Sequence, residues 1–435
     1  MNEFFRLEER GTSLRTELRG ATVTFLTMAY ILGVNPAILA QAGVPRESAV
    51  ACTAAAAGLC CILMGLVANF PLALASGMGL NSVVALSIAP QVGSWQAAMG
   101  LVVWNGIIVA ILVLCGLREA IMQAIPADIR RAIGGGIGLF IALIGMVGAG
   151  FVQQGDPPAP PVTPGSFTRP ETLLAVFGLL VTVVLMVRRV TGALLIGIVL
   201  TTAAAWLSDR CFATALVPDT GAHLERPTFE TMFQADLVSV LNWRFAPLLL
   251  SLLVVDFFDT LGTVSTIADQ AELRDDAGHI PRLRSILLVD SAAASIGGLF
   301  GASSVTSYIE SAAGVAEGAR TGLHTVFVGV MFLACIALAP LVSLVPPAAT
   351  TPALIVVGFL MAAQVRNIDW TRSETSFPAF LTMIGMPFTY SIAHGIGCGC
   401  VSFAAIKLLT LRPRELHPLM LLTALVFAAY FAWSG

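Results

Sequence analysis

The feature that most constrains this chain is a series of apolar runs of about 15–22 residues, which recur from Ala21 to Ala432. A bilayer core of roughly 30 Å needs about 20 helical residues to cross it, so many of these runs are long enough to span a membrane. The runs are continuously apolar rather than alternating, which favours helices over barrel strands. Only 11% of the 435 residues are charged, less than half the share typical of soluble domains. The sequence therefore predicts an all-α polytopic membrane protein.

The runs predict about fourteen transmembrane helices. Their expected spans are 20–40, 47–68, 71–88, 95–116, 131–150, 171–188, 191–208, 246–268, 284–300, 302–316, 321–344, 350–364, 376–391 and 393–410. A last apolar run, 417–433, is either a further crossing or a helix packed along the bundle. The breaks at 152–170 and 209–237 are rich in proline or polar residues and read as connectors.

The basic residues indicate the orientation. With a cytoplasmic N-terminus, eighteen of the 23 Arg and Lys residues fall in inside segments. The five outside are Arg46, Arg169, Arg210, Arg226 and Arg244. This bias follows the positive-inside rule, so we expect a multi-pass protein of the plasma (inner) membrane. No basic patch suggests nucleic-acid binding, and no histidine cluster suggests a metal.

The spacing of the spans predicts an internal repeat. One unit of seven spans begins near residue 20 and a second near residue 245, and because seven is odd the second unit must be inverted. The third span of each unit looks broken, at Ala73–Asn81 and at Gly301–Glu310. We read both as a short extended segment followed by a half-helix, which is tolerated in a membrane only where it lines a cavity. The alternative is close helix packing through small residues.

Two acids mark the eighth span. Asp256 lies nine residues after Pro247 and thirteen before Asp269, so its place is near the middle of the membrane. Asp259 follows one turn later on the same face. A carboxylate at that depth costs at least ~2.5 kcal/mol, which makes Asp256 a functional candidate, and a neighbouring acid suits a proton carrier. Either acid could instead be a structural group bound to helix ends or hydroxyls.

Glu310 is the second signal, at the expected start of a half-helix in span 10. Helix N-termini stabilise negative charge, and a carboxylate can accept two parallel N–H groups from a planar heterocycle. Asn81 holds the equivalent place in span 3, and Tyr308 is a candidate to cover a bound base. Each residue also has a structural alternative. Glu310 and Asn81 could be helix caps, and Tyr308 could be an aromatic residue that packs in the bundle. Asp290 and Glu317 lie nearer span ends and are read as structural.

These stretches resemble the AzgA-like adenine/guanine/hypoxanthine permeases, the purine branch of the nucleobase–cation symporters. The matching segments run nearly end to end along the chain: Arg15–Tyr30, Val34–Pro36, Ser76–Asn81, Asp256–Thr263, Thr306–Val315, Arg320–Leu323 and Pro387–Ile396. The chain departs from the family at Ser76, where relatives usually carry proline, at Ser82–Val83, and at Cys398 and Cys400, where relatives often have Phe. The departures at Ser76 and Ser82–Val83 border the expected site and could alter its specificity.

The resemblance implies a core domain and a gate domain, with substrate held between the half-helices of spans 3 and 10. The core comprises residues 1–117 and 238–345, the gate 118–237 and 346–415, and 416–435 is a C-terminal apolar segment. The binding residues that the resemblance implies are Asp256, Glu310 and Asn81, and we expect Tyr308, Thr260, Met78 and Gly79 to complete the site. Asp256 and Asp259 are the expected proton-coupling acids.

The sequence thus predicts a proton-coupled symporter that takes adenine, guanine or hypoxanthine into the cell, with no cofactor besides the proton. The expected partners are the purine and the bilayer, and a homodimer is left open. A carrier of the same fold for xanthine, uracil or a dicarboxylate is an alternative, although no Arg or Lys occurs in 71–88 or 302–316 to hold an anion. An intramembrane aspartyl protease would need its acids on facing helices, and a channel would show no proton-linked accumulation.

Overall fold

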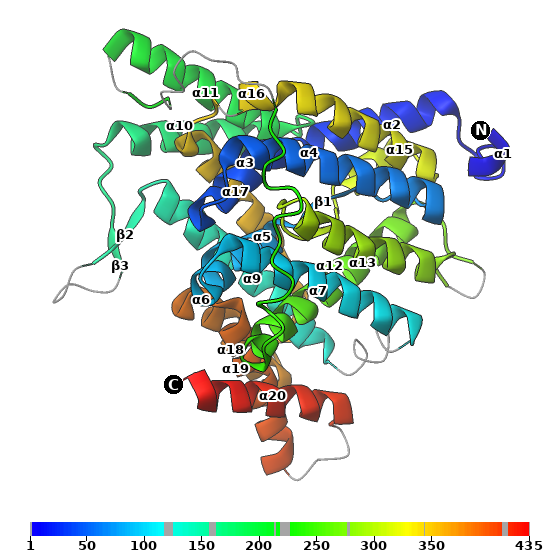
Figure 1. Cartoon of the computed structure of the whole chain (residues 1–435), viewed down its shortest axis with the longest axis vertical. Coiled ribbons are helices and arrows are strands. Elements are labelled where there is room, and N and C mark those ends of the chain that lie inside the picture. The colour runs from blue at the N-terminus through cyan, green and yellow to red at the C-terminus, as the bar shows by residue number, and fades with distance from the viewer. Residues whose placement is uncertain are drawn as a thin grey trace.

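The computed structural model describes residues 2–116, 125–155, 162–212, 215–217, 227–275, 279–342, 344–410 and 416–434. Inside its helices and strands, the side chains at 2, 154, 212, 257–259, 261, 262, 364, 433 and 434 are not part of this description. The described chain is a bundle of helices with two pairs of very short strands (Figure 1). This confirms the predicted all-α class.

The first half of the chain carries the first seven spans. Its elements are α1 (Asn2–Phe5), α2 (Leu14–Met28), α3 (Ile31–Leu39), η1 (Ala40–Ala42), α4 (Arg46–Leu63), η2 (Met64–Ala68), β1 (Leu74–Ser76), α5 (Met78–Ser82), η3 (Val83–Ile88), α6 (Ala89–Val92), α7 (Trp95–Leu114), α9 (Ala127–Gly148), β2 (Val152–Gln154), β3 (Val162–Pro164), α10 (Pro170–Val187) and α11 (Ala193–Phe212). The β2–β3 hairpin projects from the bundle beyond α9 in Figure 1.

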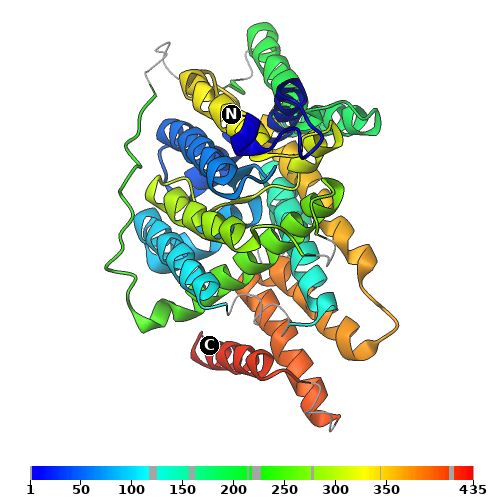
Figure 2. The ribbon, with the colours of Figure 1, turned by 90° about the vertical axis from the view of Figure 1, so that its right-hand side faces the viewer.

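The second half repeats the pattern of long helices around a broken span. Its elements are η4 (Trp243–Phe245), α12 (Ala246–Gln270), α13 (Leu283–Leu299), β4 (Val305–Ser307), α14 (Ser311–Ala316), α15 (Gly322–Ala334), η5 (Cys335–Leu338), α16 (Ala339–Val342), α17 (Pro347–Ala362), η6 (Ala363–Asn367), α18 (Ser373–Thr389), α19 (Ile392–Leu409) and α20 (Pro418–Ser434). The last apolar run is thus a separate helix, α20, which packs on α19 and touches α12 (Figure 2).

The predicted spans all coincide with these elements. Among the described residues, nine helical segments are long and apolar enough to cross a membrane by length and composition. Of the other predicted spans, two are interrupted by strands, at β1–α6 and β4–α14, and α13 and α18 have 17 residues each. The remaining one is α12, a helix of 25 residues that includes several side chains outside this description.

The two broken spans meet at the centre of the molecule. β1 pairs antiparallel with β4, with Ala75 opposite Thr306. The backbone N–H and C=O groups of the two strands form hydrogen bonds with each other there. Buried backbone at membrane depth requires such partners. Gly77 allows the close approach, because a Cβ at this position would lie 2.6 Å from Thr306 Cγ2. The predicted extended segments in spans 3 and 10 are therefore confirmed, and their antiparallel pairing fits an inverted repeat.

The helices pack in two groups around this centre. In one group α4 and α2 pack with α15, α14 packs with α2 and α12, and α13 packs with α7 and α4. In the other group α9 packs with α17 and α18, and α10 packs with α11 and α17. Gly138 of α9 and Gly358 of α17 occupy the same position counted from the start of their helices. A Cβ on either residue would come within 2.6 Å of the other's carbonyl oxygen. These glycines let the two equivalent helices of the repeat cross at backbone contact.

A long extended segment joins α11 to α12 and runs down one flank of the bundle in Figure 2. Its backbone is fixed to the first group of helices by three hydrogen bonds. Phe233 N donates to Leu299 O (2.6 Å), Asp236 N to Gln96 O (2.9 Å), and Trp104 Nε1 to Leu237 O (2.9 Å). The end of the predicted connector 209–237 is therefore packed against α7 and α13.

Candidate functional site

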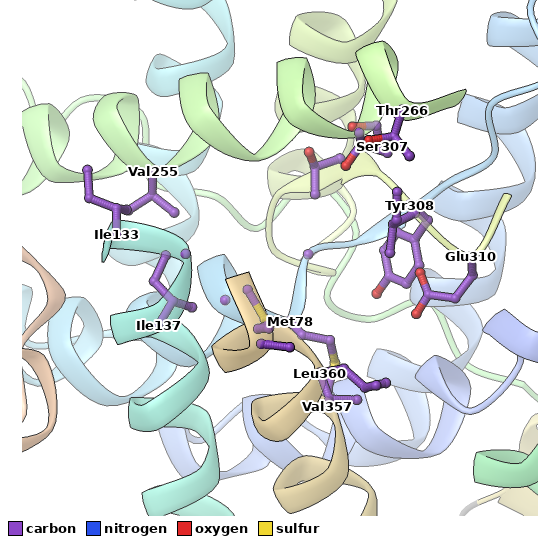
Figure 3. A pocket seen from close by; sticks show the side chains of 18 of the residues that line it. Met78, Ile133, Ile137, Val255, Thr266, Ser307, Tyr308, Glu310, Val357 and Leu360 are labelled. Carbon is purple, nitrogen blue, oxygen red and sulfur yellow. The ribbon is translucent and has the colours of Figure 1, made fainter. Parts of the chain in front are cut away.

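A cavity of about 690 Å³ lies beside the paired strands. Its wall combines residues of α5, α12, β4 and the segment between β4 and α14 with residues of α9, α17 and η6. Figure 3 shows Tyr308 and Glu310 on one side and Ile133 and Ile137 on the opposite side. A concave, mostly apolar space with a few converging polar groups is typical of a small-molecule site.

Glu310 stands at the junction of strand and half-helix. β4 ends at Ser307 and α14 begins at Ser311, so Glu310 is the residue immediately before the helix, and its side chain makes no capping hydrogen bond to a downstream backbone N–H. The carboxylate instead accepts a hydrogen bond of 2.8 Å from the Tyr30 hydroxyl. Tyr30 lies at the break between α2 and α3, so span 1 delivers this phenol at the level of the half-helices.

Tyr308 lines the cavity with its ring, while its hydroxyl is already engaged. That hydroxyl donates to Ser76 O at 2.6 Å, which connects the residue to the opposite strand β1. The backbone N–H of Tyr308 donates to Ala73 O at 3.0 Å. Both bonds hold the ring in place beside Glu310, as Figure 3 shows. A fixed aromatic ring next to a carboxylate offers a stacking surface to a flat heterocycle.

The far wall of the cavity is apolar. It is formed by Ile133 and Ile137 of α9, Val357 and Leu360 of α17, and Met78 of α5. These side chains come from both helix groups, so the cavity lies on the boundary between the groups. Such a wall complements the faces of a planar ring, because it removes apolar surface from water without demanding hydrogen bonds.

Hydroxyl groups line the third side. Thr263 and Thr266 project from α12, and Thr306 and Ser307 belong to β4. The Ser307 Oγ is buried and has no hydrogen-bond partner within the described residues. A buried hydroxyl without a partner costs about 1–3 kcal/mol, and a bound polar ligand would satisfy it.

Asp256 lies immediately behind the cavity wall. Its neighbour Val255 lines the cavity, whereas Asp256 is 1% exposed and accepts a hydrogen bond of 3.3 Å from Asn105 Nδ2. Thr260, one turn further along α12, donates to Asp290 Oδ2 at 2.6 Å. Asp256 and Thr260 are therefore not among the cavity-lining residues in this conformation, and their direct contact with substrate stays a prediction.

Thr260 nevertheless connects the cavity to a second buried acid. Its oxygen lies 3.4 Å from the hydroxyl of Thr306, which lines the cavity. Because the one Thr260 proton points to Asp290, the Thr306 hydroxyl is the donor of this second bond. Asp290 is 1% exposed near the middle of α13 rather than near its end, and its structural role stays a prediction.

Asn81 also lies behind the wall. Its Nδ2 donates to Asn35 Oδ1 at 2.6 Å, and Asn35 Nδ2 in turn bonds Thr53 and Ala302 O. Its own Oδ1 is buried without a partner among the described groups. The amide thus joins span 1 to span 3, and its contact with substrate stays a prediction. The side chain of Asp259 lies outside the described residues.

Glu310, Tyr308, Met78 and Gly79 are the predicted binding residues that the structure brings together around the cavity. Sequence reasoning missed Tyr30, Ser307, and the walls supplied by α9 and α17. Tyr30 ends the long matched stretch Arg15–Tyr30 and is a lone hydroxylated aromatic in an apolar span, which was its available signal. The residues of α9 and α17 are ordinary apolar helix residues and carry no signal of their own.

Residues 15–398 match the model of the permease family. The chain belongs to this family. The resemblance to the AzgA-like branch is confirmed, and the chain is a multi-pass membrane transporter rather than an enzyme.

Two relatives of this permease illustrate the likeness. The chain is 41% identical to the guanine/hypoxanthine permease PbuG of Bacillus subtilis (strain 168), with 99% of each chain covered. It is 38% identical to the adenine permease AdeP of Escherichia coli (strain K12), over 98% of this chain and 95% of the relative.

Solved structures support the fold. The transmembrane domain of a cyanobacterium bicarbonate transporter, BicA, superposes with a TM-score of 0.59 at 19% identity, covering 94% of this permease and 97% of that chain. At such low identity the likeness concerns architecture only. It supports the arrangement of seven plus seven spans as an inverted repeat, with the broken third span of each repeat at the centre.

Proposed function

We propose that this permease carries purine nucleobases, namely adenine, guanine or hypoxanthine, into the cell together with a proton. The observation that carries the proposal is the Glu310 carboxylate, which Tyr30 orients at the edge of a cavity with apolar walls. The names of the full-length relatives, guanine/hypoxanthine permease and adenine permease, support a purine as the substrate.

The cavity suits a neutral flat heterocycle. Adjacent ring N–H and amino groups, as on guanine, donate to a carboxylate in parallel, and such charge-assisted pairs are about twice as strong as neutral hydrogen bonds. The Tyr308 ring and the side chains of Ile137 and Val357 then cover the faces of the base. A carboxylate at this position disfavours anions such as dicarboxylates, since two negative charges would be buried side by side.

Proton coupling is proposed through the buried acids. Glu310 lines the cavity. Asp256 follows the cavity-lining residue Val255 in α12 and is buried behind it. Protonation of an acid close to the substrate is the simplest way for a base and a proton to favour each other's binding, because the coupling free energy is reciprocal. We assign the coupling to Asp256, tuned by Asp259.

Alternating access is proposed to come from movement of a gate domain (118–237 and 346–415) against a core domain (1–117 and 238–345). The packing of the helices into two groups supports this proposal, as does a cavity lined by helices of both groups. With a cytoplasmic N-terminus, the first residues of α9 and the end of η6 face inward.

The test is uptake of radiolabelled hypoxanthine, guanine and adenine into proteoliposomes with an acidic exterior. We expect accumulation above the external concentration, competition among the purines, and loss of accumulation when a protonophore is added. Equal uptake with and without the pH gradient would remove proton coupling. Absence of any saturable purine uptake, with the protein folded and correctly inserted, would remove the substrate assignment.

A further inference from the structure

The cavity has a second, positively charged end that base transport does not use. Besides Glu310, its lining includes Arg130 and Arg131 on the first turns of α9 and Arg366 in η6. All three belong to segments predicted to face the cytoplasm. An acid and three guanidinium groups therefore border one continuous space.

Two of these arginines form no ion pair with the residues that the structure describes. Arg131 pairs with Asp128 at 3.1 Å and donates to Asn367 O at 2.7 Å. Within the described part of the chain, neither Arg130 nor Arg366 forms an ion pair, and the Nε of Arg130 is buried without a hydrogen-bond partner.

Asp128 and Asp369, which lie close to these arginines in the sequence, are already engaged. Asp128 also accepts hydrogen bonds from Asp369 N and the Thr375 hydroxyl, and Asp369 pairs with Arg372 at 3.3 Å. Arg130 and Arg366 therefore have no carboxylate partner among the described residues. A buried guanidinium nitrogen without an acceptor costs more than a neutral group in the same state, so an incoming anion would be favoured.

We propose that Arg130 and Arg366, supported by Arg131, form a phosphate subsite for a purine ribonucleoside monophosphate whose base occupies the Glu310 end. The inference rests on the proposed function, because it takes Glu310 to be the base site. Guanidinium groups match phosphate oxygens in a two-pronged geometry, more closely than lysines do. The opposite charges of the two ends fix the direction of the ligand, since its phosphate would be repelled by Glu310.

The size of the cavity allows this ligand. Sites of ~300–1,000 Å³ hold molecules of drug size, and the cavity of about 690 Å³ exceeds the needs of a lone base. Such a nucleotide is the product of phosphoribosyl transfer to an imported base. It would compete with the base from the cytoplasmic side, so that uptake slows when the internal product accumulates.

The experiment uses the purified full chain in neutral phosphatidylcholine nanodiscs, with binding of radiolabelled inosine monophosphate and radiolabelled hypoxanthine measured separately. We expect the nucleotide to displace hypoxanthine competitively, whereas inosine and inorganic phosphate do so weakly. The double substitution Arg130→Ala/Arg366→Ala should weaken nucleotide binding by about tenfold or more, with hypoxanthine affinity within about twofold of the parent. The control is Arg372→Ala, an exposed ion-paired arginine outside the cavity lining.

Each outcome decides the matter. Nucleotide binding that is absent, that persists in the double variant, or that coexists with bound hypoxanthine would overturn the subsite. If anionic lipid nanodiscs stabilise the parent but not the double variant, while the nucleotide binds neither, the arginines serve lipid phosphates and the proposal fails. If the parent does not bind hypoxanthine but binds the nucleotide through the arginines, the result would contradict the proposed function. It would leave the anion subsite standing.

Discussion

The hydroxyl of Tyr30 and the carboxylate of Glu310 lie 280 positions apart in the chain and share a hydrogen bond of 2.8 Å. The bond joins the break in the first span to the start of the half-helix in the tenth. One carboxylate oxygen is thereby held in a fixed direction, and a ligand must share this carboxylate with the phenol. Span 1 is consequently part of the site, although its sequence is mostly apolar.

Removal of this donor is the first prediction. Tyr30→Phe keeps the ring that fills a fully buried position but removes the hydrogen bond to Glu310. A hydrogen bond to a charged group contributes about 1.5–3 kcal/mol, so we expect purine affinity to fall by about tenfold or more, as measured by equilibrium binding. Tyr390→Phe is the matched control, because Tyr390 is 41% exposed and lies outside the cavity lining. Equal affinities in the two variants would contradict the role of Tyr30.

The second prediction concerns coupling. Asp256→Asn keeps the volume of a side chain that is 1% exposed and removes its ability to carry a proton. We expect the variant to lose accumulation driven by a pH gradient while retaining exchange of labelled for unlabelled base across the proteoliposome membrane. Asp236→Asn, an exposed acid in the connector before α12, should behave like the parent. Accumulation at the parent level in Asp256→Asn would remove the coupling role.

The third prediction tests movement at the boundary between the helix groups. A Cβ at Gly79 of α5 would lie 2.9 Å from Ile137 Cγ2 of α9. Gly79→Leu should therefore block the approach of the two groups and reduce uptake by at least about tenfold, while the protein remains folded. The second change Ile137→Ala frees space opposite and should restore part of the activity. If Ile137→Ala does not restore uptake although both proteins are folded, the contact between Gly79 and Ile137 does not govern transport.

The fourth prediction concerns stability. Gly138→Leu would press a side chain against the backbone of Gly358 and Ala362, where even a Cβ would come within 2.6 Å. Overpacking of this kind costs about 1–3 kcal/mol, so thermal unfolding in detergent should shift to lower temperature. The control is Gly33→Ala, whose Cβ would meet no atom closer than Thr350 Cγ2 at 3.8 Å. An unchanged unfolding temperature in Gly138→Leu would contradict backbone contact between α9 and α17.

The fold was largely predictable because its main determinants are local. Apolar length sets the spans, and the inverted arrangement follows from two units of seven. Even the strands β1 and β4 could be placed, because glycines and β-branched residues interrupt both apolar spans at the same point. The nature of α20, in contrast, depends on what it packs against, and its composition alone does not say.

Part of the site was predictable from the sequence. Glu310 was predicted because a carboxylate is costly at membrane depth, and Tyr308, Met78 and Gly79 because they lie in the two broken spans. Asp256 was found for the same reason as Glu310, yet its side chain faces Asn105 behind the wall, since the direction of a side chain depends on how α12 rotates against α7. Ile133, Ile137 and Val357 complete the cavity through tertiary packing, which no local pattern encodes.

Equilibrium binding of radiolabelled hypoxanthine to the purified permease tests the central claim most directly. Glu310→Gln and Glu317→Gln are compared with the parent, because Glu317 ends the same half-helix but pairs with Arg19 at 3.0 Å, away from the cavity. The account predicts that Glu310→Gln lowers affinity by about tenfold or more and that Glu317→Gln leaves it unchanged. Parent-like affinity in Glu310→Gln would contradict the claim that this carboxylate receives the base.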